Sequence, residues 1–283
     1  MNNLARRLAS VAEQRVAGSN EGERIISLAN LATVAAEFGL TRHEAELAAL
    51  QQRVVPERYQ RNLGTIGLEG QLRLRQATVG VVGAGGLGGW VIDGLARMGV
   101  GQLIIADGDA FVESNLNRQA FCNERTLGRL KAEVACEAVA EINSAVQTRE
   151  VPRYLQDSKS MCEALAGSQV LVDALDSLPA RLQLQLAAQE LHVPLIHGAI
   201  AGFVGQVLTI FPGDPGLIAL YGDRTVPEHG VETQWGNPAS TPMLVAALQV
   251  QEVVKVLTGR GQPLQRRMFL IDGETGTVDI LEV

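Results

Sequence analysis

Residues 80–131 combine a glycine-rich turn with an acidic residue at a spacing typical of nucleotide binding. Residues 83–88 read GAGGLG and match the pattern G-x-G-x-x-G, in which backbone N–H groups approach phosphates at the start of a helix. Asp107 stands nineteen residues after Gly88, where a carboxylate accepts hydrogen bonds from ribose hydroxyls. This half of the segment fits a dehydrogenase as well as an ATP-using enzyme. The glycines of the turn are Gly83, Gly85, Gly86 and Gly88.

The other half of the segment adds an amide and two cations, contributed by Asn115, Arg118 and Lys131. We expect these side chains near the phosphates. Cations at that place suit displacement at phosphorus, because the transition state and the leaving pyrophosphate both carry negative charge. The diphosphate of a redox cofactor only needs to be held. Each residue taken singly could be a solvated loop residue, but together they favour an adenylating enzyme.

Asp176 offers a place for a metal ion. It follows the expected strand 170–174, at the carboxyl edge where α/β sheets bind their ligands. A carboxylate there could hold a Mg²⁺ ion that bridges a triphosphate, since Mg²⁺ prefers oxygen ligands. Asp176 or Ser177 could instead cap the next helix, and Asp173 could be structural.

The elements that position these residues follow from the alternation of apolar runs and helical patterns after residue 76. Because the strands alternate with helices, the sequence predicts an α/β fold with a Rossmann-like, doubly wound and mainly parallel sheet. An alternating run over 202–211 and a hairpin within 267–283 predict antiparallel strands that continue this sheet. The expected strands cover 78–82, 103–106, 148–151, 170–174 and 194–198, and the expected helices cover 87–98, 131–142, 180–191 and 243–257.

Residues 1–55 have a different character. They show helical patterns and no strand pattern, so we predict a helical N-terminal extension over 1–55, followed by one domain over 56–283. Thr41 and Glu44 form a capping box that starts a helix ending near Val54. The extension could clamp a neighbouring subunit or pack on its own domain. Residues 212–241 are rich in glycine, proline and polar residues and predict a long binding or crossover loop.

Composition argues against several classes of protein. The net charge of −7 and the pI near 5.2 disfavour a nucleic-acid surface. No apolar run approaches the length of a membrane span, and the first residues do not read as a secretory signal. The cysteines are odd in number and scattered, which predicts neither a disulfide framework nor a zinc ribbon. We expect a cytoplasmic protein whose cysteines are Cys122, Cys136 and Cys162.

Together and in this order, the motifs resemble those of the ThiF/MoeB/HesA family, the prokaryotic relatives of ubiquitin-activating enzymes. The resemblance runs from about Arg58 to the C-terminus. It implies an enzyme that uses ATP and Mg²⁺ to adenylate the C-terminal glycine of a small ubiquitin-like sulfur carrier ending in Gly-Gly, with release of pyrophosphate. Its markers are RYQRN at 58–62, the glycine turn, DGD at 107–109, SNLNRQ at 114–119, Lys131 and the pair Asp173 and Asp176.

The resemblance also implies roles for the site residues. Arg61 resembles the family's arginine that reaches the active site of the other subunit of a homodimer, where it would stabilise phosphate charge. Asp176 would hold Mg²⁺. The catalytic residues implied are Arg61, Asn115, Arg118, Lys131 and Asp176. The nucleotide-binding residues implied are Gly83, Gly85, Gly86, Gly88, Asp107, Asp109, Ser114 and Ser177.

The sequence departs from the family at several positions. Many members carry a zinc ribbon of two Cys-x-x-Cys pairs and a cysteine in the crossover loop, but residues 212–242 contain no cysteine. We therefore expect no zinc site and no thioester on this chain. The usual Asp-Asn pair reads Asp176-Ser177, and Cys122, although near Arg118, is expected to be buried and inert. Two alternatives stay open: adenylation of a peptide in natural-product biosynthesis, and a nucleotide-binding scaffold without turnover.

Overall fold

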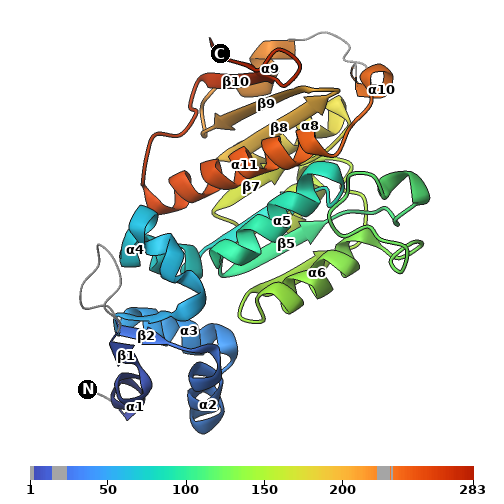
Figure 1. The fold of residues 1–283 in the computed structure, drawn as a ribbon. Helices are drawn as coiled ribbons and strands as arrows, with labels where there is room; N and C mark the ends of the chain where they lie inside the picture. Colours follow the sequence, from blue (N-terminus) through green and yellow to red (C-terminus); the bar gives the residue numbers. More distant parts are fainter. Residues whose placement is uncertain (1–2, 15–23, 222–229, 231) are drawn as a thin grey trace.

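The computed structural model describes residues 3–14, 24–221, 230 and 232–283. Its centre is an eight-stranded sheet with the strand order β11-β10-β9-β8-β7-β4-β5-β6 (Figure 1). The strands from β8 to β6 in this order run parallel, whereas β9, β10 and β11 are antiparallel to their neighbours. The predicted sheet, mainly parallel with antiparallel strands at one edge, is therefore confirmed. The strands are β4 (Thr78–Val82), β5 (Gln102–Ala106), β6 (Gln147–Val151), β7 (Val170–Asp173), β8 (Leu195–Ala201), β9 (Val204–Ile210), β10 (Arg267–Asp272) and β11 (Thr277–Glu282).

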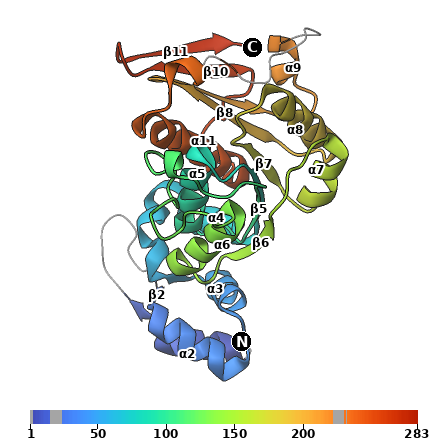
Figure 2. The ribbon, with the colours of Figure 1, turned by 90° about the vertical axis from the view of Figure 1, so that its right-hand side faces the viewer.

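Helices cover both faces of this sheet. α5, α6 and α11 pack on one face, and α7 and α8 pack on the other (Figure 2). The central strands β4, β5 and β7 are thus buried on both sides, which explains their mainly apolar sequences, whereas the edge strand β6 is polar and mostly exposed. None of the helices in the described part of the chain is long and apolar enough to cross a lipid bilayer. The helices are α5 (Gly86–Met98), α6 (Lys131–Ile142), α7 (Ser158–Leu165), α8 (Leu178–Glu190) and α11 (Ser240–Thr258).

The strand order reverses at β4, which lies between β5 and β7. At such a switch point a crevice opens beyond the carboxyl ends of the strands, because the connections leave in opposite directions. The glycine turn follows β4, Asp107 follows β5, and Asp176 lies a few residues beyond the end of β7. The fold therefore brings three segments that are distant in sequence to one edge of the sheet.

The N-terminal part contains short strands, so the prediction of a purely helical extension was wrong. β1, β2 and β3 form a separate three-stranded sheet beside the helices. The capping box is confirmed, since the Thr41 side chain accepts from the Glu44 N–H and the Glu44 side chain accepts from the Thr41 N–H. These elements are α1 (Asn3–Val11), β1 (Glu13–Gln14), β2 (Arg24–Ile26), α2 (Leu28–Phe38), α3 (Arg42–Gln51) and β3 (Val54–Pro56).

The end of α3 shows why the helical periodicity was misleading. The helix stops at Gln51, and Arg53 takes a positive φ of 59°, a left-handed conformation that a regular helix does not contain. The β-branched pair Val54 and Val55 then pairs in parallel with β2, as its strand propensity favours. Both valines are buried. The apolar spacing therefore correctly indicated buried side chains, but these belong to a strand and not to a helix.

The N-terminal part lies at the end of the molecule opposite the C-terminal hairpin of β10 and β11 (Figures 1 and 2). A 3₁₀ helix, η1 (Glu57–Asn62), and α4 (Leu63–Gln76) connect it to the large sheet. A division of the chain at residues 55 and 56 stays a prediction.

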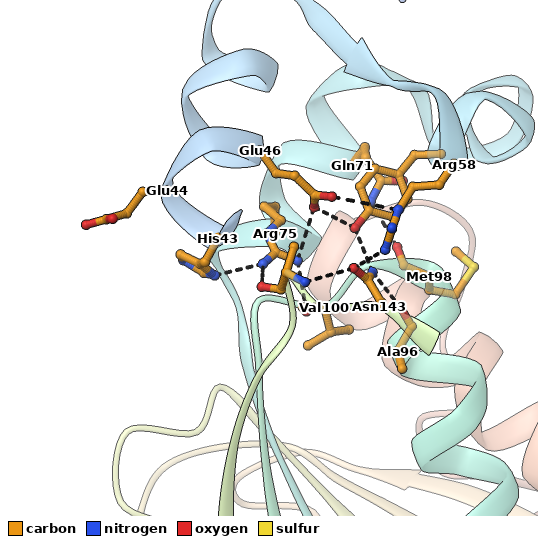
Figure 3. Close-up of polar contacts among 12 residues, drawn as sticks. His43, Glu44, Glu46, Arg58, Gln71, Arg75, Ala96, Met98, Val100 and Asn143 are labelled. Carbon is orange, nitrogen blue, oxygen red and sulfur yellow. Dashed lines mark hydrogen bonds and ion pairs between the residues drawn. The ribbon is translucent and has the colours of Figure 1, made fainter. Parts of the chain in front are cut away.

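A buried polar network joins the N-terminal part to the rest of the protein (Figure 3). Glu46 on α3 accepts a hydrogen bond from the Tyr59 hydroxyl at 2.7 Å and lies 3.5 Å from Nη1 of Arg75. Asn143, directly after α6, donates to the Tyr59 oxygen at 2.8 Å and to the carbonyl of Ala96 on α5 at 3.0 Å. Glu46 and Arg75 are 1% and 0% exposed. The network therefore fixes the C-terminal ends of α5 and α6 against the extension.

Replacing Glu46 with alanine should destabilise the protein by about 3–5 kcal/mol, because it leaves the Arg75 guanidinium buried without its carboxylate. Burial raises the pKa of Glu46, although the charge of Arg75 beside it acts in the opposite direction. Chemical denaturation followed by circular dichroism would measure the loss. Glu69→Ala is the matched control, because Glu69 is a surface residue with its side chain 74% exposed, and we expect a change within about 0.5 kcal/mol. Equal stability of the two variants would contradict a structural role for the network.

Candidate active site

A cleft of about 800 Å³ lies at the carboxyl ends of the central strands and extends over β8 and β9. Its volume falls within the range of small-molecule binding sites. The lining residues come from the glycine turn, the ends of β5 and β7, the start of α6, the two antiparallel strands and the segment before α11. The predicted site residues that line it are Gly83, Gly85, Gly86, Asp107, Asp109, Arg118, Lys131, Asp176 and Ser177.

The glycine turn brings backbone to the cleft where side chains would not fit. Gly83 has a φ of +96°, and a Cβ at this position would lie 2.5 Å from the carbonyl oxygen of Ala174. A Cβ at Gly88 would lie 1.8 Å from the carbonyl oxygen of Gly83. Gly88 does not line the cleft, so its contribution is the close packing of α5 on the turn. The N–H groups that begin α5 are left to face the cleft, as anion binding requires.

Asp107 is held in place by the backbone around it. Its two carboxylate oxygens accept hydrogen bonds from the Ala84 N–H at 2.7 Å and from the Asp109 N–H at 2.8 Å. Burial raises the pKa of Asp107, although Lys131 and these two N–H groups favour the ionised form. Asp107 therefore lies beside the glycine turn, as the sequence predicted, and its carboxylate has a fixed orientation.

Lys131 is a buried cation at the first turn of α6. Its Nζ lies 2.8 Å from Oδ2 of Asp109, and the Tyr154 hydroxyl donates to the other oxygen of Asp109. Burial alone would raise the pKa of Asp109, but the hydrogen bonds from Lys131 and Tyr154 outweigh it and lower the pKa. An anion that enters the cleft would compete with Asp109 for the ammonium group.

The loop before α6 presents Arg118 to the cleft, whereas Ser114 and Asn115 lie outside the cleft lining. Asn115, at the end of the 3₁₀ helix η2 (Glu113–Asn115), is buried and its side chain accepts from the Val112 N–H at 3.1 Å. The Arg118 Nη1 donates to the Ser114 carbonyl at 2.9 Å and to the Asn117 side chain at 2.8 Å. Asn115 and Ser114, predicted as site residues, do not line the cleft and instead shape the loop that carries Arg118.

Asp176 and Arg61 lie at different places relative to the cleft. Asp176 is exposed and lines the cleft. Ser177 is the N-cap residue of α8, but no side-chain hydrogen bond caps that helix. Among the described residues, no group of three or more His, Cys, Asp or Glu side chains could hold a metal ion. Arg61 is exposed on η1 and does not line the cleft of its own chain.

The segment 212–241 contains more structure than its composition indicated. It includes two short helices, α9 (Gly216–Tyr221) and α10 (Glu232–Trp235), on either side of residues outside the described part of the chain. Trp235 and Asn237 line the cleft. The carbonyl of Asn237 accepts from the Asn117 side chain at 3.1 Å, which ties this segment to the loop that carries Arg118.

A buried charged cluster behind the cleft was missed by sequence reasoning. The Nδ1 of His197 lies 2.7 Å from Oδ2 of Asp173, and Nη1 of Arg181 lies 3.5 Å from the same oxygen. These residues come from β8, β7 and α8, and their proximity depends on the parallel pairing of Asp173 with His197. The sequence offers no local signal for such a contact. Gln119 and Tyr154 were likewise given no individual role, yet both line the cleft.

Burial disfavours the thiolate form of all three cysteines. Cys122 is buried, and burial raises its pKa although Lys131 and Arg118 favour the thiolate. Burial also raises the pKa of Cys136, and that of Cys162 to about 11. A thiol with a raised pKa is a poor nucleophile near neutral pH, because the thiolate is the reactive form.

Comparison with known proteins finds similar sequences among adenylyltransferases and similar folds among solved structures. Residues 59–283 match the sequence pattern of the ThiF family. The SAMP-activating enzyme E1 of Haloferax volcanii is 36% identical over 222 residues, which cover 76% of this chain and 81% of that protein. The sulfur carrier protein adenylyltransferase of Thermus thermophilus is 34% identical over 234 residues, covering 76% of this chain and 83% of its own. The crystal structure of E. coli MccB with ATP has the same fold, with a TM-score of 0.67 and 22% identity over 80% of this chain and 70% of that one.

Proposed function

Because this chain belongs to the ThiF family, we propose that it uses ATP to adenylate the C-terminal glycine carboxylate of a ubiquitin-like sulfur carrier. The observation that carries the proposal is the joint presence of Asp107, Arg118 and Lys131 around the glycine turn in one cleft. An oriented carboxylate suits a ribose, and two cations suit phosphates under attack. The names of the relatives from Haloferax volcanii and Thermus thermophilus support the carrier as substrate.

The reaction proposed is a displacement at the α-phosphorus of ATP. An oxygen of the glycine carboxylate forms a bond to that phosphorus, and the bond from phosphorus to the oxygen bridging the α- and β-phosphates breaks. Pyrophosphate leaves with the electron pair of that bond, and the product is an acyl adenylate. Lys131 and Arg118 stabilise the negative charge that develops on the phosphates.

The other cleft residues hold the nucleotide. The start of α5 at Gly86 receives the phosphates, and Asp107 accepts from the ribose hydroxyls. The chemistry of the donors fits a Mg²⁺ ion at Asp176, because Mg²⁺ takes one or two carboxylates together with phosphate oxygens. When bound, this ion would neutralise part of the triphosphate charge. Asp109 balances Lys131 until the phosphates arrive.

We also propose that the active protein is a homodimer. Arg61 is exposed and outside the cleft of its own chain, so its contribution to phosphate charge requires a second subunit. In this arrangement each cleft receives Arg61 from the partner. We place the reaction in the cytoplasm, which the three free thiols support, and the acyl adenylate passes to another protein because no reactive cysteine lines the described part of the cleft.

ATP–pyrophosphate exchange tests the proposed function. The assay uses the purified protein with labelled pyrophosphate, ATP and a MoaD-like carrier that ends in Gly-Gly, and a carrier lacking its last glycine is the control. We expect exchange with the intact carrier and none with the shortened one. Exchange with a short free peptide in place of the carrier would favour a peptide substrate. ATP binding without exchange would contradict the proposal and favour a non-catalytic scaffold.

A further inference from the structure

The part of the cleft beyond the nucleotide residues has a floor of small side chains. Ala199 and Ala201 on β8 and Val204 and Gln206 on β9 line it. Ala199 pairs with Gln206, and Ala201 pairs with Val204, across the antiparallel ladder. Since alternate residues of a strand point to the same side, these four side chains share one face of the sheet. The floor is thus mostly apolar, with one amide side chain on it.

The amide of Gln206 is oriented by His197. Its Nε2 lies 3.1 Å from Nε2 of His197, and Nδ1 of His197 lies 2.7 Å from Oδ2 of Asp173. Because a carboxylate only accepts, Nδ1 carries the imidazole proton and Nε2 is left as an acceptor. Gln206 therefore donates its N–H to His197. Its oxygen Oε1 is then the atom that remains for a ligand in the cleft.

Buried charges support this orientation. Asp173 and His197 are both 0% exposed, and Arg181 donates to the Gly198 carbonyl at 2.7 Å. Burial lowers the pKa of His197, with Arg181 acting in the same direction and Asp173 in the opposite one, and the lowered pKa favours the neutral ring. Burial alone would raise the pKa of Asp173, but the charge of Arg181 and the hydrogen bond from His197 outweigh burial, and the pKa is lowered. Because buried charges are stable only when they are paired and hydrogen-bonded, the three side chains hold one another in a fixed arrangement.

A second acceptor lies in the same cleft. The side-chain oxygen of Asn237 is shielded from solvent and accepts no hydrogen bond from any described residue. Trp235, two residues earlier, packs against Gly202 at the turn between β8 and β9, where a Cβ on Gly202 would lie 3.3 Å from the Cβ of Trp235. The segment before α11 thus forms a wall beside the small-residue floor.

We propose that Gln206 is a specificity-determining residue for the acyl substrate, and that its Oε1 accepts a hydrogen bond from a peptide N–H of the extended tail that ends in the reacting carboxylate. His197, Asp173 and Arg181 are positioning residues that act through Gln206. A glycine tail brings N–H groups out of water, and each needs an acceptor. The alanines of the floor leave room for a backbone without side chains. The inference rests on the proposed adenylation of such a tail.

Gln206→Met tests the contact directly, because methionine has a similar length and no amide. We expect the KM for the Gly-Gly carrier to rise about tenfold or more, as loss of a buried hydrogen bond implies. The KM for ATP and the kcat at saturating carrier should change less than about twofold. The matched control is Gln251→Met, since Gln251 is exposed on α11, and its constants should equal those of the wild type. An unchanged KM for the carrier in Gln206→Met would overturn the inference.

A change in the substrate identifies the group that Gln206 binds. Two carriers made by chemical ligation each have sarcosine, which lacks the N–H, at one of the last two positions. We expect one of these carriers to have a raised KM with the wild type and nearly the same KM as the normal carrier with Gln206→Met, because both changes then remove the same contact. Equal factors in both proteins with each of the two carriers would show that Gln206 does not bind the tail N–H.

A double-mutant cycle tests the positioning role of His197. His197→Phe should raise the carrier KM in the wild type and add little in the Gln206→Met background, whereas a purely structural defect would add in both. His197→Gln keeps a donor for Asp173 and should restore part of the affinity if His197→Phe folds poorly by circular dichroism. Wild-type protein that binds ATP but shows no exchange contradicts the proposed function. If the wild type is active but the effects of His197→Phe and Gln206→Met on the carrier KM are additive, only the positioning role of His197 is contradicted.

Discussion

Lys131→Ala or Arg118→Ala should lower the rate of ATP–pyrophosphate exchange by about 10²–10³-fold, because each removes a fixed donor to charge that develops in the transition state. ATP binding should largely survive, since the glycine turn and Asp107 still hold the nucleotide. Lys131 is 6% exposed, so its charge acts through a medium that screens it less than water does. Exchange assays and isothermal titration with ATP measure the two quantities separately.

The control for these variants is Arg125→Ala. Arg125 is exposed in the same loop and does not line the cleft, so its removal should leave exchange unchanged. A double variant of Arg118 and Lys131 that still catalysed exchange would disprove the mechanism. Loss of ATP binding in parallel with activity would mean that the cations hold the ground state and not the transition state.

Mixing inactive Arg61→Ala subunits with inactive Asp176→Ala subunits should restore about a quarter of the wild-type activity if Arg61 acts across a homodimer. Half of the dimers formed at random are mixed, and each mixed dimer has one cleft with its own Asp176 and an intact Arg61 from the partner. An arginine supplied in this way contributes a large factor to phosphoryl transfer. Exchange rates after subunit unfolding and refolding together give the measurement.

The outcome separates the two geometries for Arg61. If Arg61 served the cleft of its own chain, every cleft in the mixture would lack one of the two residues, and no activity would return. Arg53→Ala mixed with Asp176→Ala provides the reference, because Arg53 has its side chain 77% exposed and lies outside the cleft. In that mixture, the Arg53→Ala subunits keep both Arg61 and Asp176, so its activity is the reference for mixing with one unimpaired subunit.

The parallel sheet and the glycine turn could be predicted because their signals are local. The apolar runs of β4, β5 and β7 are continuous, and α6 begins at Lys131 as its pattern indicated. Parallel strands buried on both faces leave such runs in the sequence. The gathering of Asp107, Asp176 and the glycine turn then follows from the rule that carboxyl ends meet at the switch point.

Contacts between distant segments could not be predicted in the same way. Val54 had the spacing of a helix face, and only its pairing with the short strand at Arg24 identifies it as part of a strand. His197 reads as an isolated histidine, since its partners Asp173 and Arg181 come from other elements of the sheet and its cover. The Asn115 side chain was expected near the phosphates of the nucleotide, but it accepts a hydrogen bond from the Val112 N–H within its own loop.

Recombinant fragments that begin at residue 56 would contain all of the family-matching sequence and still lack residues that pack into its interior. The Tyr59 hydroxyl and the Arg75 guanidinium would lose Glu46 and become open to water. α5 and α6 begin at the nucleotide cleft and end beside these groups, so a change in packing at their C-terminal ends would shift the helices whose first turns line the cleft. For protein engineering, the N-terminal extension is best kept together with the domain that contains the cleft.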